Sequence, residues 1–99
     1  MNQPCILFRP QAEKEFEEAV AWYEGKIPGL GLEFHQSVEQ ILGRIVEMPD
    51  RFPAVLPGIR EAPVSRFPFC VYYRTRPGFI VVLSVFHQAR DPGLWQRGN

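Results

Sequence analysis

Arg66-Phe-Pro-Phe-Cys-Val-Tyr-Tyr-Arg74 and Phe79-Ile-Val-Val-Leu-Ser-Val-Phe86 are the two stretches that decide the fold class. Both are rich in aromatic and β-branched residues, which favour β-strands. Between them, the sequence Arg76-Pro-Gly-Phe79 places proline and glycine at the two central positions of a turn, as a type II turn prefers. We therefore expect strands over 69–73 and 79–86 that pair as an antiparallel hairpin.

The residues before this hairpin predict two helices and two further strands. A short apolar run over 5–8, bounded by prolines, suits a first strand, and strand character returns over 59–64. Apolar residues recur at helical spacing in two segments: Ala12, Phe16, Ala19, Val20 and Tyr23, then Phe34, Val38, Ile41, Leu42 and Ile45. The segment 28–31 breaks these helices apart, and prolines at 49, 53 and 57 predict an irregular connection over 50–58.

The end of the chain predicts one more element. Asp91 followed by Pro92 suits a helix N-cap and first helical position, so we expect a short helical turn carrying Leu94 and Trp95. The element order is then β-α-α-β-β-β with a C-terminal helical turn. This order predicts one α+β domain over residues 1–99, with a helical hairpin packed on one face of a mostly antiparallel sheet.

The composition is that of an ordinary globular domain, with 45% hydrophobic and 22% charged residues. No apolar run is long enough for a membrane span and no secretory signal is recognisable, so we expect a cytoplasmic protein without a membrane partner. Cys5 and Cys70 are expected to be buried, reduced thiols. His35 and His87 are far apart and lack a second ligand at a metal-binding spacing, so neither a metal nor a cofactor is expected.

The overall charge of zero conceals two halves of opposite sign. Residues 1–50 contain four basic and nine acidic side chains, a net charge of −5. Residues 51–99 contain seven arginines and two acidic side chains, a net charge of +5. The second half therefore suits an acidic partner or a phosphate group.

Taken in order along the chain, these segments resemble the RelE/ParE superfamily, the small toxins of bacterial type II toxin–antitoxin modules. The resemblance rests on Phe8-Arg-Pro10, Glu17-Glu-Ala-Val-Ala-Trp-Tyr-Glu24, Pro28-Gly-Leu-Gly31, Phe34 with Val38-Glu39, Arg60-Glu-Ala-Pro-Val64, Arg66-Phe-Pro-Phe69, Val71-Tyr-Tyr73, and His87 with Arg90-Asp-Pro92. It implies a toxin held inactive by a cognate antitoxin, whose extended or helical C-terminal segment wraps the toxin. Members resembling RelE cleave messenger RNA in the ribosomal decoding site, whereas members resembling ParE poison DNA gyrase.

The residues favour the ParE-like branch over a nuclease. A ribonuclease needs a base, an acid and cations at the phosphate, and only His87 and Arg90 are candidates for these roles. By its resemblance to RelE-like nucleases, the chain has Trp95 near a position where many members carry a tyrosine, and Phe69 or Cys70 where they carry a strand arginine. These departures predict a toxin that grips a protein target and breaks no bond.

The candidate binding residues are arginines and one tryptophan, residue types that dominate protein interfaces. They are Arg60, Arg66, Arg74, Arg76, Arg90, Trp95 and Arg97. Contact with gyrase-bound DNA remains an alternative for the same surface, as does a family member that has lost toxicity and only binds an antitoxin.

Several of the singled-out residues also have purely structural readings. Arg66 alternatively pairs with an acid of the first helix, and His87 alternatively bonds a backbone carbonyl. Trp22 and Tyr23 are expected to pack in the core. Tyr72 and Tyr73 are expected to point to opposite faces of the sheet, one buried and one exposed.

Overall fold

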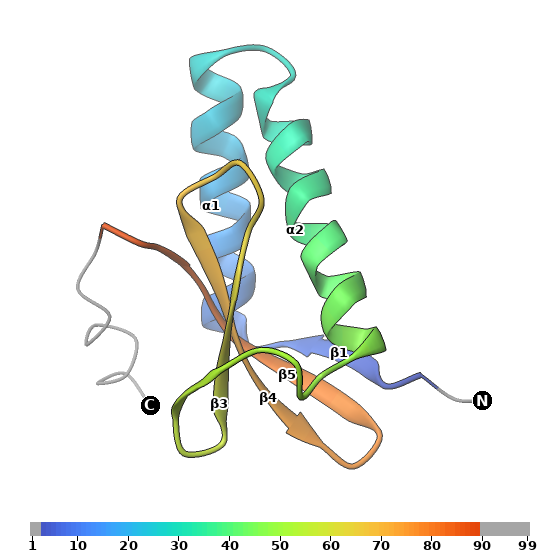
Figure 1. The fold of residues 1–99 in the computed structure, drawn as a ribbon. Coiled ribbons are helices and arrows are strands. Elements are labelled where there is room, and N and C mark those ends of the chain that lie inside the picture. The colour runs from blue at the N-terminus through green and yellow to red at the C-terminus, as the bar shows by residue number, and fades with distance from the viewer. Residues whose placement is uncertain (1–2, 90–99) are drawn as a thin grey trace.

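The structure, a computed structural model, describes residues 3–89, which form two helices and five strands (Figure 1). In chain order these are β1 (Cys5–Phe8), α1 (Pro10–Lys26), α2 (Leu30–Glu47), β2 (Ala54–Leu56), β3 (Ile59–Pro63), β4 (Phe69–Arg76) and β5 (Phe79–His87). The predicted α+β class is confirmed, with one additional strand. The helical turn expected at 91–95 lies outside the described residues.

The five strands form one sheet in the order β1-β5-β4-β3-β2. β1 runs parallel to β5, and the other three neighbouring pairs are antiparallel. The β4–β5 hairpin turns as predicted, because Gly78 has a φ of 84°, the left-handed value that a type II turn requires at its third residue. The mostly antiparallel sheet is therefore confirmed.

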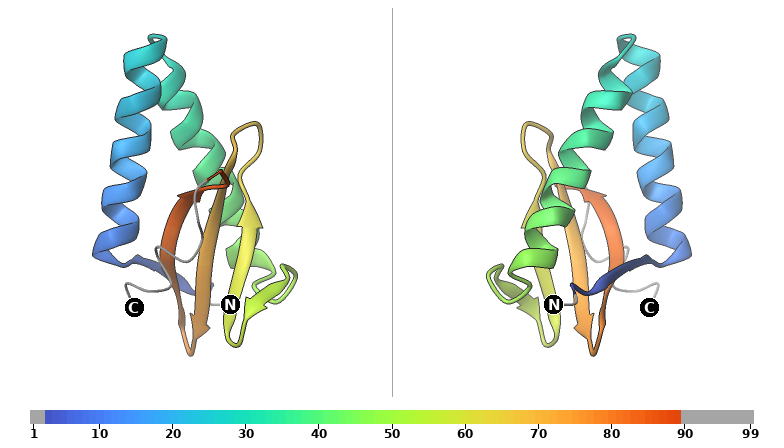
Figure 2. Two further views of the ribbon diagram at one scale, coloured as in Figure 1. Left: turned by 90° about the vertical axis from the view of Figure 1, so that its left-hand side faces the viewer. Right: turned by 90° about the vertical axis from the view of Figure 1, so that its right-hand side faces the viewer.

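Both helices cover the same face of the sheet, and the main core lies between them (Figure 2). The predicted stripe of α2 is buried there, with Phe34, Val38 and Ile45 fully inaccessible to solvent. From the sheet, alternate residues such as Val71 and Tyr73 of β4 meet it. The opposite face carries a smaller cluster made of strand residues only: Ile59, Cys70, Tyr72, Leu83 and Phe86.

Helix α2 begins inside the segment that was expected to break the helices. The Glu24 carboxylate accepts hydrogen bonds from the N–H groups of Gly29 (2.9 Å) and Gly31 (3.0 Å), so it satisfies donors at the start of α2. Gly31 lies against α1 so closely that a Cβ there would stand 2.7 Å from the carbonyl oxygen of Val20. The absence of a side chain at position 31 therefore allows the tight crossing of the two helices.

A second side chain of α1 reaches an irregularity in β5. Between Tyr72 and Tyr73 the β4–β5 register shifts, so their partners are Ser84 and Val82 and one residue of β5 is skipped. At this bulge Glu15 accepts hydrogen bonds from the Ser84 hydroxyl (2.7 Å) and from the N–H of Val85 (3.0 Å). Ser84 is fully buried, so the carboxylate supplies an acceptor that solvent does not.

Two expectations about the ends of the sheet were wrong. Strand β2 forms within 50–58, because prolines flank its three residues and β2 lies at a sheet edge, where proline is tolerated. Cys5 is exposed, because β1 is the other edge strand and Cys5 points away from the helices. Cys70 is buried, and both thiols are free as predicted.

Two expectations about aromatic residues were also wrong. Trp22 is 58% exposed, because its neighbour Tyr23 is the residue that faces Phe34 and the core. Tyr72 and Tyr73 do point to opposite faces, yet both are buried, because each face of the sheet has its own apolar cluster. No helix within 3–89 is long and apolar enough to cross a lipid bilayer.

Candidate functional site

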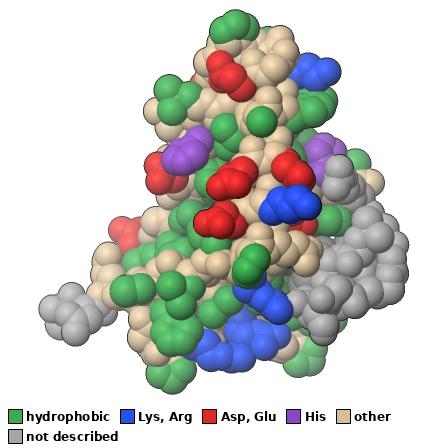
Figure 3. Space-filling model, turned by 180° about the vertical axis from the view of Figure 1, so that it is seen from behind, with side chains coloured by type: hydrophobic (Ala, Val, Ile, Leu, Met, Phe, Trp, Pro, Cys, Tyr) green, Lys and Arg blue, Asp and Glu red, His purple; other side chains and the backbone are tan. Residues whose placement is uncertain are grey.

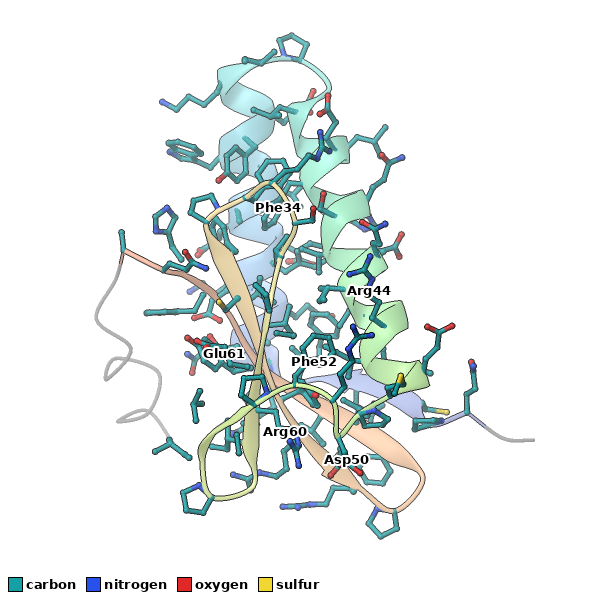
Figure 4. All side chains as sticks on the ribbon, viewed as in Figure 1. Phe34, Arg44, Asp50, Phe52, Arg60 and Glu61 are labelled. Atoms are coloured by element: carbon teal, nitrogen blue, oxygen red, sulfur yellow. The ribbon has the colours of Figure 1, made fainter. Side chains whose placement is uncertain are left out.

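The Arg60 side chain, on β3, forms its hydrogen bonds and its ion pair with other residues of the protein. Its Nη1 donates to the carbonyl oxygens of Phe52 (2.6 Å) and Asp50 (3.2 Å), and its Nη2 lies 3.7 Å from Asp50 Oδ1. Figure 4 shows Arg60 beside Asp50, with Glu61 directed to the other side of β3. The guanidinium therefore fastens the loop before β2 to the sheet, which occupies the donors that a partner would need.

Arg66 lies in the turn between β3 and β4 with a φ of 70°, a left-handed value that is uncommon for a residue with a side chain. Its Nη1 is 3.4 Å from Glu33 Oε1, so its acidic partner comes from α2 and not from the first helix. Both side chains are more than half exposed, and such surface pairs stabilise a fold by about 0–1 kcal/mol. Arg66 is thus held only loosely and remains available to a partner.

Arg74 and Arg76 lie on β4, on the face of the sheet that points away from the helices. Of the three ion pairs within residues 3–89, none includes either arginine. Arg76 is exposed and its Nη1 donates only to the neighbouring Thr75 carbonyl oxygen (3.3 Å). The Nε of Arg74 is buried and has no hydrogen-bond partner. Glu61 of β3 lies on the same face, where its carboxylate accepts from Tyr72, and it forms no ion pair with either arginine.

His87 lies at the other end of the same hairpin. It pairs with Phe69, whereas Arg74 pairs with Val81, and the six residue steps from 81 to 87 span roughly 20 Å of strand. The His87 ring packs edge-on against Phe69, and its Nδ1 accepts a hydrogen bond from the N–H of Ala89 (3.0 Å). The expected bond to a backbone carbonyl is therefore replaced by one from a backbone amide. Arg74 and Arg76 are not brought near this histidine.

The two tyrosines of β4 are engaged in hydrogen bonds. The Tyr72 hydroxyl donates to Glu61 Oε2 (2.6 Å), and burial together with this carboxylate raises the pKa of Tyr72 above its usual value. The Tyr73 hydroxyl donates to the Pro49 carbonyl oxygen (2.5 Å), and burial raises the pKa of Tyr73 to about 12. Neither phenol is placed to give up a proton near neutral pH.

The lysines and the buried cysteine of residues 3–89 add no further reactive group to this part of the sheet. The only lysines in this range, Lys14 and Lys26, lie on α1. Burial raises the pKa of the Cys70 thiol, which leaves it protonated. No group of three or more His, Cys, Asp or Glu side chains within the described part of the chain is placed to hold a metal ion. Arg90, Trp95 and Arg97, three of the predicted site residues, lie outside the described residues.

A groove lies beside the two helices, and its acidic lining was not anticipated from the sequence, which predicted an arginine-lined groove. Its apolar floor includes Phe16 and Val20, and the carboxylates of Glu13, Glu17 and Glu24 line it. In Figure 3, acidic side chains predominate over the helices and basic side chains gather toward the opposite end. The spacing of these glutamates, i, i+4 and i+11, is the sequence signal that would have placed them along one side of α1.

Comparisons with known proteins agree with this architecture. The family model described as "ParE toxin of type II toxin-antitoxin system, parDE" matches residues 6–92. No curated protein sequence matches the chain. The fold is similar to that of a solved chain titled "Chromosomal ParDE TA system from P. aeruginosa", with a TM-score of 0.74 and 18% identity over 86% of this chain and 96% of that chain. Since the family model spans most of the sequence, the chain belongs to the ParE toxin family of type II toxin–antitoxin systems.

Proposed function

We propose that this toxin inhibits growth by binding a protein target such as DNA gyrase, that it breaks no bond itself, and that a cognate antitoxin neutralises it in the cytoplasm. The observation that carries the proposal is the separation of the charged groups. His87 lies at one end of the β4–β5 hairpin, and Arg74 and Arg76 lie toward the other, with roughly 20 Å of strand between them. A phosphate at one end would be out of reach of the groups at the other.

The alternative is a ribosome-dependent messenger RNA endonuclease that uses His87 and Arg90. Such an enzyme needs a base at the attacking 2′-hydroxyl and an acid at the leaving oxygen, each within hydrogen-bond reach. Among residues 3–89, the phenols of Tyr72 and Tyr73 are held by other acceptors and have raised pKa values. This arrangement supports the binding function over the nuclease.

Membership of the ParE family supports an antitoxin as the physiological partner. The two surfaces described above have opposite signs, since glutamates line the helical groove and unpaired arginines lie on the far sheet face. An antitoxin that wraps the toxin would meet both. The gene next to that of the toxin is the place to look for this antitoxin.

Induced expression with and without the adjacent gene tests the proposal first. We expect colony counts to fall when the toxin is expressed alone and to recover when the neighbouring protein is co-expressed. Unchanged counts for the toxin alone would leave only an antitoxin-binding module.

Two assays with purified protein then separate the targets. A gyrase supercoiling assay should yield linearised or relaxed plasmid, whereas a translating extract should keep its messages intact. Messages cut at codons, with cutting lost in His87→Ala or Arg90→Ala, would establish the nuclease and overturn the proposal. Tyr72→Phe is a matched control, because it alters the same sheet without touching the two candidate nuclease residues.

A further inference from the structure

The face of the sheet that points away from the helices carries a row of side chains from edge to edge. Leu7 of β1 pairs with Val81 of β5, and Val81 pairs with Arg74 of β4. On the other side of β4, the antiparallel pairing of Arg60 with Tyr73 places Ile59 of β3 opposite Arg74, and Ile59 pairs with Leu56 of β2. Paired residues share a face, so this row crosses five strands, a width of roughly 19 Å.

A second row lies next to the first toward the β4–β5 turn. Phe79 of β5 pairs with both Cys5 of β1 and Arg76 of β4. We call the accessible members of the two rows the sheet-face patch, which consists of Cys5, Leu7, Leu56, Arg74, Arg76, Phe79 and Val81.

The sheet-face patch combines exposed apolar surface with positive charge that has no partner. Leu7 is 51% and Leu56 is 36% exposed, and Phe79 and Val81 are partly exposed between them. Arg74 and Arg76 form no ion pair within residues 3–89, and Arg74 Nε is a buried donor without an acceptor. A buried donor that is left unpaired destabilises the state in which it occurs. A carboxylate brought against this guanidinium would supply the acceptor after a small rotation of the side chain.

We propose that an acidic segment of the antitoxin, which also carries apolar side chains, covers the sheet-face patch in the neutralised complex. This inference rests on the proposed function and adds the surface and the chemistry of the partner. The acidic side chains of the segment pair with Arg74 and Arg76, and its apolar side chains cover Leu7, Val81 and Leu56. Charge complementarity sets the register of the segment and apolar burial supplies most of its affinity.

The composition of the patch favours a protein over a nucleic acid. Phosphate backbones are bound through clusters of Lys and Arg with polar side chains and backbone N–H groups. Here aliphatic side chains outnumber the two arginines, which is the composition of a protein interface. The patch also favours the antitoxin over the target. An exposed apolar face promotes aggregation unless it is covered. Under the proposed function the toxin is bound to its antitoxin until it is released, so the antitoxin is the partner that would cover this face.

Charge reversal at Arg76 tests the inference, with affinity for the product of the adjacent gene measured by isothermal titration at low and at moderate salt. Arg76→Glu should weaken binding by about tenfold or more at low salt, and the difference should shrink as salt is added. Arg44→Glu is the matched control, because Arg44 is exposed on α2, forms no ion pair in the described residues and undergoes the same change of charge. It should stay within about twofold of the unaltered protein.

The apolar half of the patch is tested in the same way. Leu7→Ser should weaken binding, whereas Leu32→Ser, which alters a leucine that is 60% exposed on α2, should not. Circular dichroism melts confirm that each variant is folded. If Arg76→Glu does not fold, Arg76→Gln carries the test with the same expected direction.

Affinity for the antitoxin decides the outcome. Unchanged affinity of Arg76→Glu at low salt, or an equal loss in Arg44→Glu, would overturn the proposal. A loss of toxicity or of binding to a DNA duplex without any loss of antitoxin affinity would assign the patch to the target or to nucleic acid, and would overturn it as well. Failure of the unaltered chain to slow growth would instead contradict the proposed function and leave the affinity measurement valid.

Discussion

Replacing Gly31 with alanine tests whether the close crossing of α1 and α2 fixes the helical hairpin. A Cβ at position 31 would stand 2.7 Å from the Val20 carbonyl oxygen and 2.9 Å from Glu24 Oε1. The carbonyl belongs to the backbone of α1 and cannot turn aside, so the helices must separate. Separation also lengthens the hydrogen bonds from the N–H groups of Gly29 and Gly31 to the Glu24 carboxylate.

The expected magnitude follows from three opposing effects. Forcing a methyl group into a packed site costs about 1–3 kcal/mol. Weakening the contacts at the start of the helix adds about 0.5–2 kcal/mol. The higher helix propensity of alanine returns up to about 1 kcal/mol. With the full propensity gain subtracted, we expect Gly31→Ala to lower the free energy of unfolding by about 0.5–4 kcal/mol. Each kcal/mol corresponds to about 4–8 °C in Tm.

Gly43→Ala is the matched control in the same helix. A Cβ at position 43 meets no atom within 4 Å, so this substitution should raise the free energy of unfolding by up to about 1 kcal/mol. Urea and thermal unfolding of both variants, followed by far-ultraviolet circular dichroism, measure the two changes. If Gly31→Ala were as stable as Gly43→Ala, the tight crossing would not be the reason for glycine at position 31.

Three further predictions concern contacts that span the fold. Glu15→Ala should lower the free energy of unfolding by about 2–4 kcal/mol, because the buried Ser84 hydroxyl and a strand N–H lose their acceptor. Exposed Glu18→Ala is its control in the same unfolding assay, and equal effects would contradict the role of the contact. Arg60→Gln should speed proteolysis of the loop before β2 and lower the free energy of unfolding by about 1–3 kcal/mol, since two loop carbonyls lose a charged donor; an unchanged cleavage rate would refute the tether. Burial raises the pKa of Tyr73 from 10.0 to about 12, so the unfolded chain ionises first, and the stability due to Tyr73 is present below pH 10 and is lost as pH rises toward 12. Tyr73→Phe should flatten that decline in a series of urea titrations, and an unchanged slope would show that another group causes it.

The elements that the sequence predicted correctly are those with a strong local pattern. The stripe of α2 repeats over about three turns and is buried as expected, and the β4–β5 hairpin follows from two apolar runs around Pro77 and Gly78. In both cases the pattern and the final environment agree, because one face of each element meets the core.

The differences arise where distant parts of the chain decide the outcome. Strand β2 has only two residues paired with β3, and it forms because β3 offers it an edge. Cys5 is exposed because β1 lies at the rim of the sheet, a position that depends on its pairing with β5 at the far end of the chain. Neither outcome can be predicted from the residues that neighbour each strand in the sequence.

The candidate site was predicted as a set of arginines, and the fold gives them different tasks. Arg60 and Arg66 come from the positive half of the chain and meet Asp50 and Glu33 of the negative half, contacts between residues 10 and 33 positions apart. Composition alone could not distinguish these arginines, because it says nothing about how far each one lies from an acidic side chain in the fold. The register along β4 then separates His87 from Arg74 by most of the length of the hairpin.

The opposite charges of the two halves therefore do not simply attract one another in the folded chain. Arg60 and Arg66 form ion pairs with acids, whereas β4 carries Arg74 and Arg76 to the sheet face that no helix covers, where neither forms an ion pair within residues 3–89. The acidic side chains of α1 lie on the other side of the molecule and cannot reach them. A partner that covered both surfaces would need acids opposite the sheet and bases opposite the helices, so we expect an alternation of charge along a neutralising segment that reaches both.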